Sequence, residues 1–192
     1  GAMLVQVYIA KLGTASVAAN AVSNTIAVFQ TLPGMAIGNA VLTVSAQCAG
    51  AGDYEQVKYY AKKLHIIIYG MMIVCCLGVI AALPAVLHVY SLSAEATAMT
   101  EDIIVYHGIC CMIIWPIAFT LPNVLRASND VAFCMILSIL SMWICRIGMS
   151  YVLGVRMGFG VFGVWVAMTM DWVVRAIFFV LRYRSGKWQH QM

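Results

Sequence analysis

Apolar and polar residues alternate along this chain in long blocks rather than in the short periods of a soluble domain. An α-helix needs about 20 predominantly apolar residues to cross about 30 Å of hydrocarbon, and most of the apolar blocks reach that length. We expect six spans, at about residues 1–10, 16–49, 64–89, 103–125, 131–155 and 160–182. The first block is short and is expected to be the end of a longer span. The pattern therefore predicts an all-α, polytopic transmembrane helix bundle.

The second block is longer than one perpendicular crossing requires. No acidic or basic side chain occurs from Leu12 to Gly52, so a tilted or bent helix is expected. Pro33 lies within this block, and proline removes a backbone N–H and clashes with the carbonyl four residues before it. We therefore expect the bend of this helix at Pro33.

Polar residues recur on the second helix at four-residue intervals, which places each group on one face. Asn20 and Asn24, with Gln30 further along the helix, are interpreted as the wall of an aqueous cavity near the proline bend. The reason is that a polar row on a membrane helix must face protein or water. Hydrogen bonding between helices is the alternative. Helix packing is the expected role of a second polar row, formed by Asn39, Thr43 and Gln47.

The last apolar block carries an acid and a base in its middle. Within the 19 residues from Gly163 to Leu181, only Asp171 and Arg175 are charged. They share a face with Gly163 and Ala167, because all four recur every fourth residue. Small residues let another helix approach closely, so this face is expected to point into the protein. An ionisable residue inside a membrane indicates a functional site, although an acid–base pair can also be retained for packing alone.

Three further residues are candidates for a substrate or cation pathway. His107 and Trp115 share a face of the fourth span, which Pro116 and Pro122 are expected to break. Trp115 is placed to form the floor of a site for flat cations, whereas a lone histidine in a span is more often simply hydrogen bonded. Arg146 lies in the fifth span and is the third candidate.

Composition and charge agree with a multi-pass protein of the cell membrane. The chain is 64% hydrophobic and 9% charged, against about 25% charged in soluble domains. Most basic residues outside the spans lie in the loops 53–63 and 126–130 and in the tail 182–192. The positive-inside rule predicts that these segments are cytoplasmic. The net charge of +4 is therefore explained by topology, and no nucleic-acid partner is expected.

No cofactor, metal site or enzymatic activity is expected. The seven cysteines lie in or at the edge of apolar blocks and lack the spacing of a disulfide framework. His107, with Cys110 and Cys111, lacks an evident fourth metal ligand. No nucleophile, base and orienting group fall at a spacing that catalysis would use.

Three stretches of the sequence resemble the multidrug and toxic compound extrusion (MATE) family. They are GTASVAANAVSNTIAVFQTLPGMAIGNAVLTVSAQCAGAGDYEQVKYYAKK, WPIAFTLPNVLRASNDV and GVFGVWVAMTMDWVVRAIFFVLRYRSGKW. Their order and spacing are similar to those of the C-terminal lobe of a family member. The resemblance covers well over half of the chain and contains no catalytic motif.

The resemblance implies a twelve-helix transporter of two similar six-helix lobes, of which residues 1–192 form one. The missing N-terminal lobe and the lipid bilayer are then the structural partners, and small organic cations or drugs are the cargo. Export would be coupled to antiport of Na⁺ or H⁺, with a central cavity that opens alternately to either side. Acidic cation ligands that many relatives carry in the fourth span of this lobe have no counterpart between Asp102 and Arg126.

Two other functions compete with drug efflux. A flippase for lipid-linked saccharides has a related helical plan, but it is expected to line its lobe with several arginines for pyrophosphate. Only Arg146 and Arg175 are available in the spans. A non-transporting membrane module, such as a sensor or an assembly partner, is the other alternative, and it would leave the polar wall of the second helix without a purpose.

Overall fold

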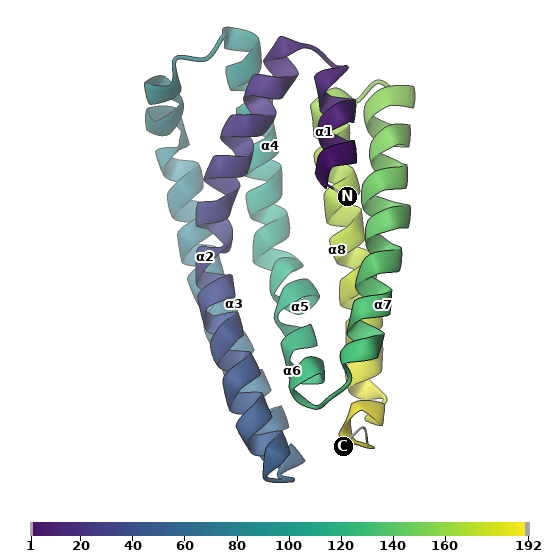
Figure 1. The fold of residues 1–192 in the computed structure, drawn as a ribbon. Helices are drawn as coiled ribbons and strands as arrows, with labels where there is room; N and C mark the ends of the chain where they lie inside the picture. Colours follow the sequence, from purple (N-terminus) through teal and green to yellow (C-terminus); the bar gives the residue numbers. More distant parts are fainter. Residues whose placement is uncertain (1, 191–192) are drawn as a thin grey trace.

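The computed structural model describes residues 2–190, and every regular element in that range is helical (Figure 1). Two helices of 37 residues, α2 (Thr14–Gly50) and α3 (Tyr54–Tyr90), run antiparallel along one side of the bundle. The short α1 (Ala2–Ala10) lies on the other side, beside α8 and the segment Tyr151–Arg156. The remaining elements are α4 (Ala94–Ile113), α5 (Trp115–Phe119), α6 (Leu121–Ala127), α7 (Val131–Ser141) and α8 (Gly160–Arg184).

The helices confirm the expected fold class. Four are long and apolar enough to cross a membrane: α2, α3, α8 and the continuous helix Val131–Arg156 that α7 begins. The fifth candidate span is a broken one, in which α4 meets the pair α5 and α6 at an angle of 67°. Pro116 and Pro122 lie in the first turns of α5 and α6, where the missing N–H costs nothing. The expected breaks of the fourth span are therefore present.

Helix α2 continues through Pro33 as one 37-residue helix. The carbonyl that proline deprives of its donor is that of Phe29, and the Cys75 thiol of α3 donates to it over 3.2 Å. A Cβ atom on the next residue, Gly34, would collide with the Trp115 ring. The glycine therefore lets α2 and α5 pack closely beside the proline.

Two aspartates at the basic end of the bundle precede helices and have different roles. The Asp53 side chain accepts a hydrogen bond of 3.0 Å from the Gln56 backbone N–H, so it caps α3. Asp130 makes no such bond at the start of α7. Its carboxylate accepts two hydrogen bonds from Arg182, of 2.7 and 3.0 Å. The end of α8 is thereby attached to the start of α7.

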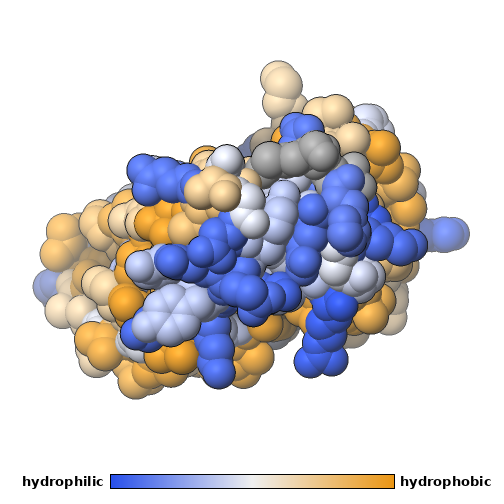
Figure 2. Space-filling model, turned by 90° about the horizontal axis from the view of Figure 1, so that it is seen from below, coloured by the Kyte–Doolittle hydropathy of each residue, from blue (hydrophilic) through white to orange (hydrophobic). Residues whose placement is uncertain are grey.

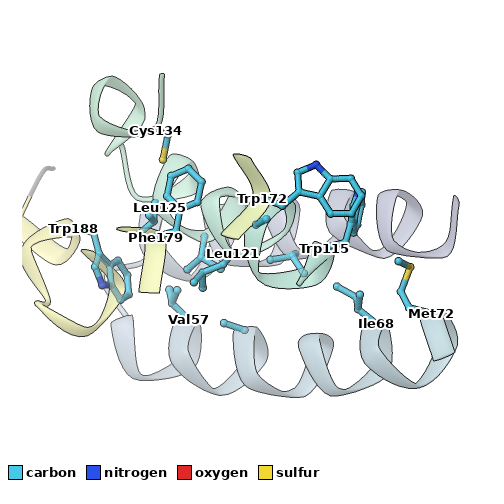
Figure 3. Packing of buried hydrophobic residues seen from close by; sticks show 14 of the residues in the cluster. Val57, Ile68, Met72, Trp115, Leu121, Leu125, Cys134, Trp172, Phe179 and Trp188 are labelled. Atoms are coloured by element: carbon cyan, nitrogen blue, oxygen red, sulfur yellow. The ribbon is translucent and has the colours of Figure 1, made fainter. Parts of the chain in front are cut away.

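Large apolar side chains hold the two sides of the bundle together. In the largest cluster, Trp172 and Phe179 of α8 approach the middle segments α5 and α6, while Ile68 and Met72 approach from α3 (Figure 3). A second cluster joins α2, α3, α4 and α8 nearer the opposite end and is built on Ile26, Leu83, Leu87, Ile103, Ile104 and Trp165. Helix α8 takes part in both clusters, so its side chains lie at the centre of the lobe.

The segments of the chain that carry most of the basic residues lie at one end of the bundle. The α2–α3 turn, the α6–α7 turn and the end of α8 lie at the same end of the bundle (Figure 1). Seen from that end, hydrophilic side chains gather in the middle of the face and hydrophobic ones surround them (Figure 2). The segments 53–63 and 126–130 and the described part of the tail thus share one end; residues 191–192 lie outside the described residues.

Candidate functional site

A chain of aromatic and amide side chains crosses the interior from α2 to α8. The Trp165 ring donates its N–H to Oδ1 of Asn20 over 3.0 Å. His107 lies between the rings of Trp165 and Trp172, each 5.3 Å from it centre to centre. Its Nδ1 lies 2.6 Å from Oε1 of Gln30. Asn20 and Gln30 lie on α2 and His107 lies on α4, so the packing of α2, α4 and α8 brings these three predicted residues into one chain of contacts.

The aromatic chain continues along the broken span. The Phe119 ring stacks on Trp115 at 5.1 Å and meets the edge of Trp172 at 5.7 Å. The Arg175 guanidinium lies 5.7 Å from the centre of the Phe119 ring. A cation over an aromatic face is stabilised by the ring quadrupole. Trp115 and Arg175 are therefore connected through Phe119, a residue that the sequence pattern did not single out.

Asp171 is the most deeply buried acidic side chain in the described part of the chain, with 1% of its surface exposed. Its Oδ1 accepts from Arg175 Nε over 3.0 Å and also from the Ser141 hydroxyl of α7. The Arg175 guanidinium donates to the Ser138 carbonyl over 3.1 Å. The second oxygen, Oδ2, is buried and has no hydrogen-bond partner among the described residues.

A cavity of about 190 Å³ lies between α1, α2, α8 and the helix that α7 begins. Asn20, Asn24, Arg146 and Ser150 contribute polar groups to its lining, and Val164, Trp165 and Met168 of α8 contribute apolar ones. Where the helix Val131–Arg156 borders the cavity, its backbone departs from α geometry and forms the π-helical segments Met142–Met149 and Tyr151–Arg156. Such segments are often found at functional sites.

A second hollow, a groove of about 380 Å³, runs between α2 and the pair α5 and α6. Its residues include Trp115 and Phe119, and Asn39, Thr120 and Asn123 supply uncharged polar groups. The Asn123 amide donates to the Gly38 carbonyl over 2.9 Å, which holds α6 against α2. The groove thus combines stacked rings with amide and hydroxyl groups.

The expectation for the second polar row of α2 was wrong. Asn39, Thr43 and Gln47 are exposed rather than packed against other helices of the lobe. Asn39 lines the groove, and the Thr43 hydroxyl bonds only to the Asn39 backbone carbonyl, at 3.0 Å, as far as the described hydrogen bonds show. A four-residue spacing shows which residues share a face, but not whether a neighbour covers it.

All eight predicted residues lie in or beside these features. Asn20, Gln30, His107, Trp115, Asp171 and Arg175 belong to the chain of contacts that ends at the ion pair, whereas Asn24 and Arg146 line the cavity. Sequence reasoning missed Trp165, Phe119 and Ser141. Trp165 had a usable signal, since it lies seven residues before Trp172 and so on the same face of α8.

Known proteins share this chain's fold. An MOP superfamily transporter from Pyrococcus furiosus, described as having a reversed polarity of its binding pocket that suggests a different function, matches with a TM-score of 0.79 and 19% identity. A MATE protein solved in complex with MaL6 matches with a TM-score of 0.78 and 20% identity. Each match covers 92% of this chain and 39% of the other protein.

Two proteins of Bacillus subtilis are related in sequence. The probable multidrug resistance protein YoeA is 24% identical over 187 residues, which is 92% of this chain and 38% of YoeA. The uncharacterized transporter YisQ is 36% identical over 66 residues, which is 34% of this chain and 14% of YisQ. The chain therefore spans about two fifths of the length of YoeA and of each solved transporter.

The family model described as MatE matches residues 1–152. This match covers more than half of the chain and includes the proline-containing α2 and the broken span α4–α6, and the fold agrees with that of solved MATE and MOP transporters. Members of this family are transporters and not enzymes. The chain belongs to the MatE family of membrane transporters.

Proposed function

We propose that this chain is one lobe of a two-lobe exporter that moves flat organic cations or drugs out of the cell in exchange for Na⁺ or H⁺. The similarity to a probable multidrug resistance protein supports this proposal. Alternating access of a central cavity between two matched lobes is the mechanism by which transporters built from repeats work. The missing lobe would close the other side of that cavity.

The exposed polar face of α2 is the observation that carries the proposal. Most exposed side chains on the long helices are apolar, as lipid contact requires, but Asn24, Asn39, Thr43 and Gln47 are exposed on α2. Amide groups in the hydrocarbon region are tolerated only where they meet protein or water. This face therefore fits the inner wall of a path that a second lobe completes, and the groove with Trp115 opens beside it.

The stacked rings of Trp115 and Phe119 fit the proposed cargo. Their centres lie 5.1 Å apart with an angle of 25° between their planes, and the groove that they line contains no charged side chain among its described residues. A flat aromatic cation gains from contact with such rings, by about 0.5 to 2 kcal/mol per favourable cation–π contact. The surrounding amides supply acceptors that orient it.

Asp171 is the residue that we propose binds the coupling ion. A buried carboxylate oxygen without a partner is costly, and a bound proton or a small cation at Oδ2 removes that cost. The adjacent Ser141 hydroxyl and Arg175 guanidinium hold the other oxygen in place. A bound ion would then favour one arrangement of α7 and α8 over another, and only such a difference in affinity between two states can drive exchange.

The orientation of the lobe in the cell membrane follows from its charge. The basic segments 53–63 and 126–130 and the tail share one end of the bundle, and the positive-inside rule assigns that end to the cytoplasm. The flippase alternative has less support, because Arg175 is already engaged by Asp171 and only Arg146 remains for a pyrophosphate among the arginines in the middle of the spans.

Ethidium transport by the full-length parent in proteoliposomes tests the proposal. Trp115→Leu keeps an apolar side chain in the packed position but removes the aromatic face. We expect it to raise the KM for ethidium roughly 2- to 30-fold, which corresponds to the loss of one cation–π contact. Trp143→Leu is the matched control, because Trp143 is 55% exposed and is not among the described residues that line the groove.

Two outcomes would count against the proposal. The parent protein would have to move ethidium under an imposed Na⁺ or H⁺ gradient, and no flux under either gradient would refute drug–ion exchange. Equal KM values for Trp115→Leu and Trp143→Leu would remove the aromatic groove from the substrate path. Loss of coupled but not of downhill flux in Asp171→Asn would support the role of the carboxyl in coupling.

A further inference from the structure

The cavity between α1, α2, α8 and the π-helical segment has an electrostatic character of its own. Among the described residues that line it, Arg146 is the only charged one. The ion pairs of the described part of the chain join Arg175 to Asp171, Arg182 to Asp130 and Lys58 to Glu55, and Arg146 belongs to none of them. The lobe therefore presents a half-buried guanidinium to a cavity without an internal acid to neutralise it.

The neighbouring ion pair does not remove this excess charge. Asp171 lies within electrostatic reach of Arg146, but its Oδ1 is occupied by Arg175 and Ser141. Two guanidinium groups thus share one carboxylate, and one positive charge remains. A guanidinium keeps its charge at any accessible pH, so the excess cannot be relieved by losing a proton. An anion in the cavity would relieve it.

Neutral donors accompany the guanidinium. The indole N–H of Trp165 can only donate, so its bond of 3.0 Å to Asn20 requires the amide oxygen of Asn20 to face the ring. The NH₂ group of Asn20 is then left as a donor at the cavity, and the amide of Asn24 also lines it. Carboxylates are bound well by such a set, because the planar guanidinium matches them with two parallel hydrogen bonds.

The walls of the cavity indicate what carries the anion. The apolar part of the lining, which includes Val164, Trp165 and Met168, is suited to the carbon atoms next to an acidic group. We propose that this cavity is a subsite for the carboxylate of an amphipathic, zwitterionic substrate, with Arg146 as its anchor.

This proposal rests on the proposed export function and extends it to a substrate class. A matched pair of dyes separates the two: a rhodamine with a free benzoate carboxyl and its methyl ester, which differ only in the acidic group. Uptake of each dye is measured with the full-length parent in vesicles of phosphatidylcholine. If the wild-type protein moves neither dye, the export proposal fails; if it moves the ester but not the acid, only the carboxylate subsite fails.

The variant Arg146→Gln keeps hydrogen-bond donors but removes the charge. We expect it to raise the KM of the acid relative to that of the ester by roughly 10- to 150-fold, the loss typical of charge-assisted hydrogen bonds. Arg146→Lys keeps the charge but lacks the planar guanidinium that donates two parallel hydrogen bonds. Its ratio of the acid KM to the ester KM is therefore expected to fall between those of wild type and Arg146→Gln. Arg156→Gln, at the exposed last residue of the segment Tyr151–Arg156, is the matched control and is expected to keep the wild-type ratio of the acid KM to the ester KM.

Two results would overturn the assignment. One is an unchanged acid-to-ester ratio in both Arg146 variants, provided that they elute as folded protein. The other concerns anionic lipid, whose phosphate shares the chemistry of a carboxylate. If phosphatidylglycerol alters transport by the wild type but not by Arg146→Gln, while the dye ratio is unaffected, the cavity serves a lipid headgroup and not the substrate.

Discussion

The ion pair of Asp171 and Arg175 offers a quantitative test of how charge is held inside this lobe. The two side chains are 1% and 13% exposed and 3.0 Å apart. Removing one partner of a buried pair costs about 3 to 5 kcal/mol, whereas replacing both by apolar residues of similar volume is often neutral or stabilising. We therefore expect the double variant Asp171→Leu/Arg175→Met to be more stable than either single variant by at least about 2 kcal/mol.

The structure also predicts which single variant is the worse. A carboxyl left without its partner can bind a proton and become neutral, and Asp171 would still have Ser141 and the nearby Arg146. Arg175 in the Asp171→Leu protein cannot lose its charge and would retain only the Ser138 carbonyl. It would also be left with Arg146 as a second positive charge. Asp171→Leu should therefore cost more than Arg175→Met.

Unfolding of the purified parent protein in mild detergent by added SDS measures these differences, with far-UV circular dichroism as the readout. The four proteins form a double-mutant cycle, which isolates the interaction of the pair from the separate effects of each substitution. Two results would refute the reasoning: a double variant whose loss equals the sum of the single losses, or an Arg175→Met protein that is less stable than Asp171→Leu. Either result would mean that the pair is not held as a buried unit.

Two further predictions concern packing and the basic end, and the same unfolding measurement checks both. Gly163→Ala should lower the free energy of unfolding by about 1 to 3 kcal/mol, because its Cβ would lie 2.9 Å from backbone atoms of the neighbouring helix. Gly78→Ala is the control and should be nearly neutral, because its Cβ would have nothing within 4 Å. Equal losses of stability in the two variants would contradict this prediction. Asp130→Asn should cost about 1.5 to 3 kcal/mol through its bonds to Arg182. Glu55→Gln removes an ion pair whose acid is 86% exposed and should cost under about 0.5 kcal/mol. A larger loss of stability in Glu55→Gln than in Asp130→Asn would be evidence against the link between α7 and α8.

Much of the fold could be predicted because it depends on local properties of the chain. The length of an apolar block decides whether a helix can cross the bilayer, and the prolines at 116 and 122 decide where the fourth span breaks. Pro33 shows the limit of this reasoning: the sequence predicted one long helix through the proline, which α2 is, but not the group that bonds to the freed carbonyl. The thiol of Cys75 on another helix supplies a donor to the carbonyl that the proline freed.

The candidate site was predictable as a list of residues but not as an arrangement. Buried ionisable and amide groups stand out in an apolar sequence, so Asn20, His107 and Asp171 could be named from composition and periodicity alone. Arg175, the partner of Asp171, could also be named, because it lies four residues further along the same helix. The partners of Asn20 and His107 could not be, because each lies on a helix distant in sequence. The bond between Asn20 and Trp165, for example, joins residues 145 positions apart.

The sequence by itself determined that this protein is a helical membrane bundle and which charged residues lie within its apolar blocks. Only the tertiary structure decided which polar faces are covered and which remain open. That outcome depends on how far each helix is rotated and how closely pairs approach, which is set by contacts such as that of Gly34 with Trp115. Hydrophobic periodicity cannot predict those contacts, because lipid and a neighbouring helix are equally apolar surroundings for a side chain.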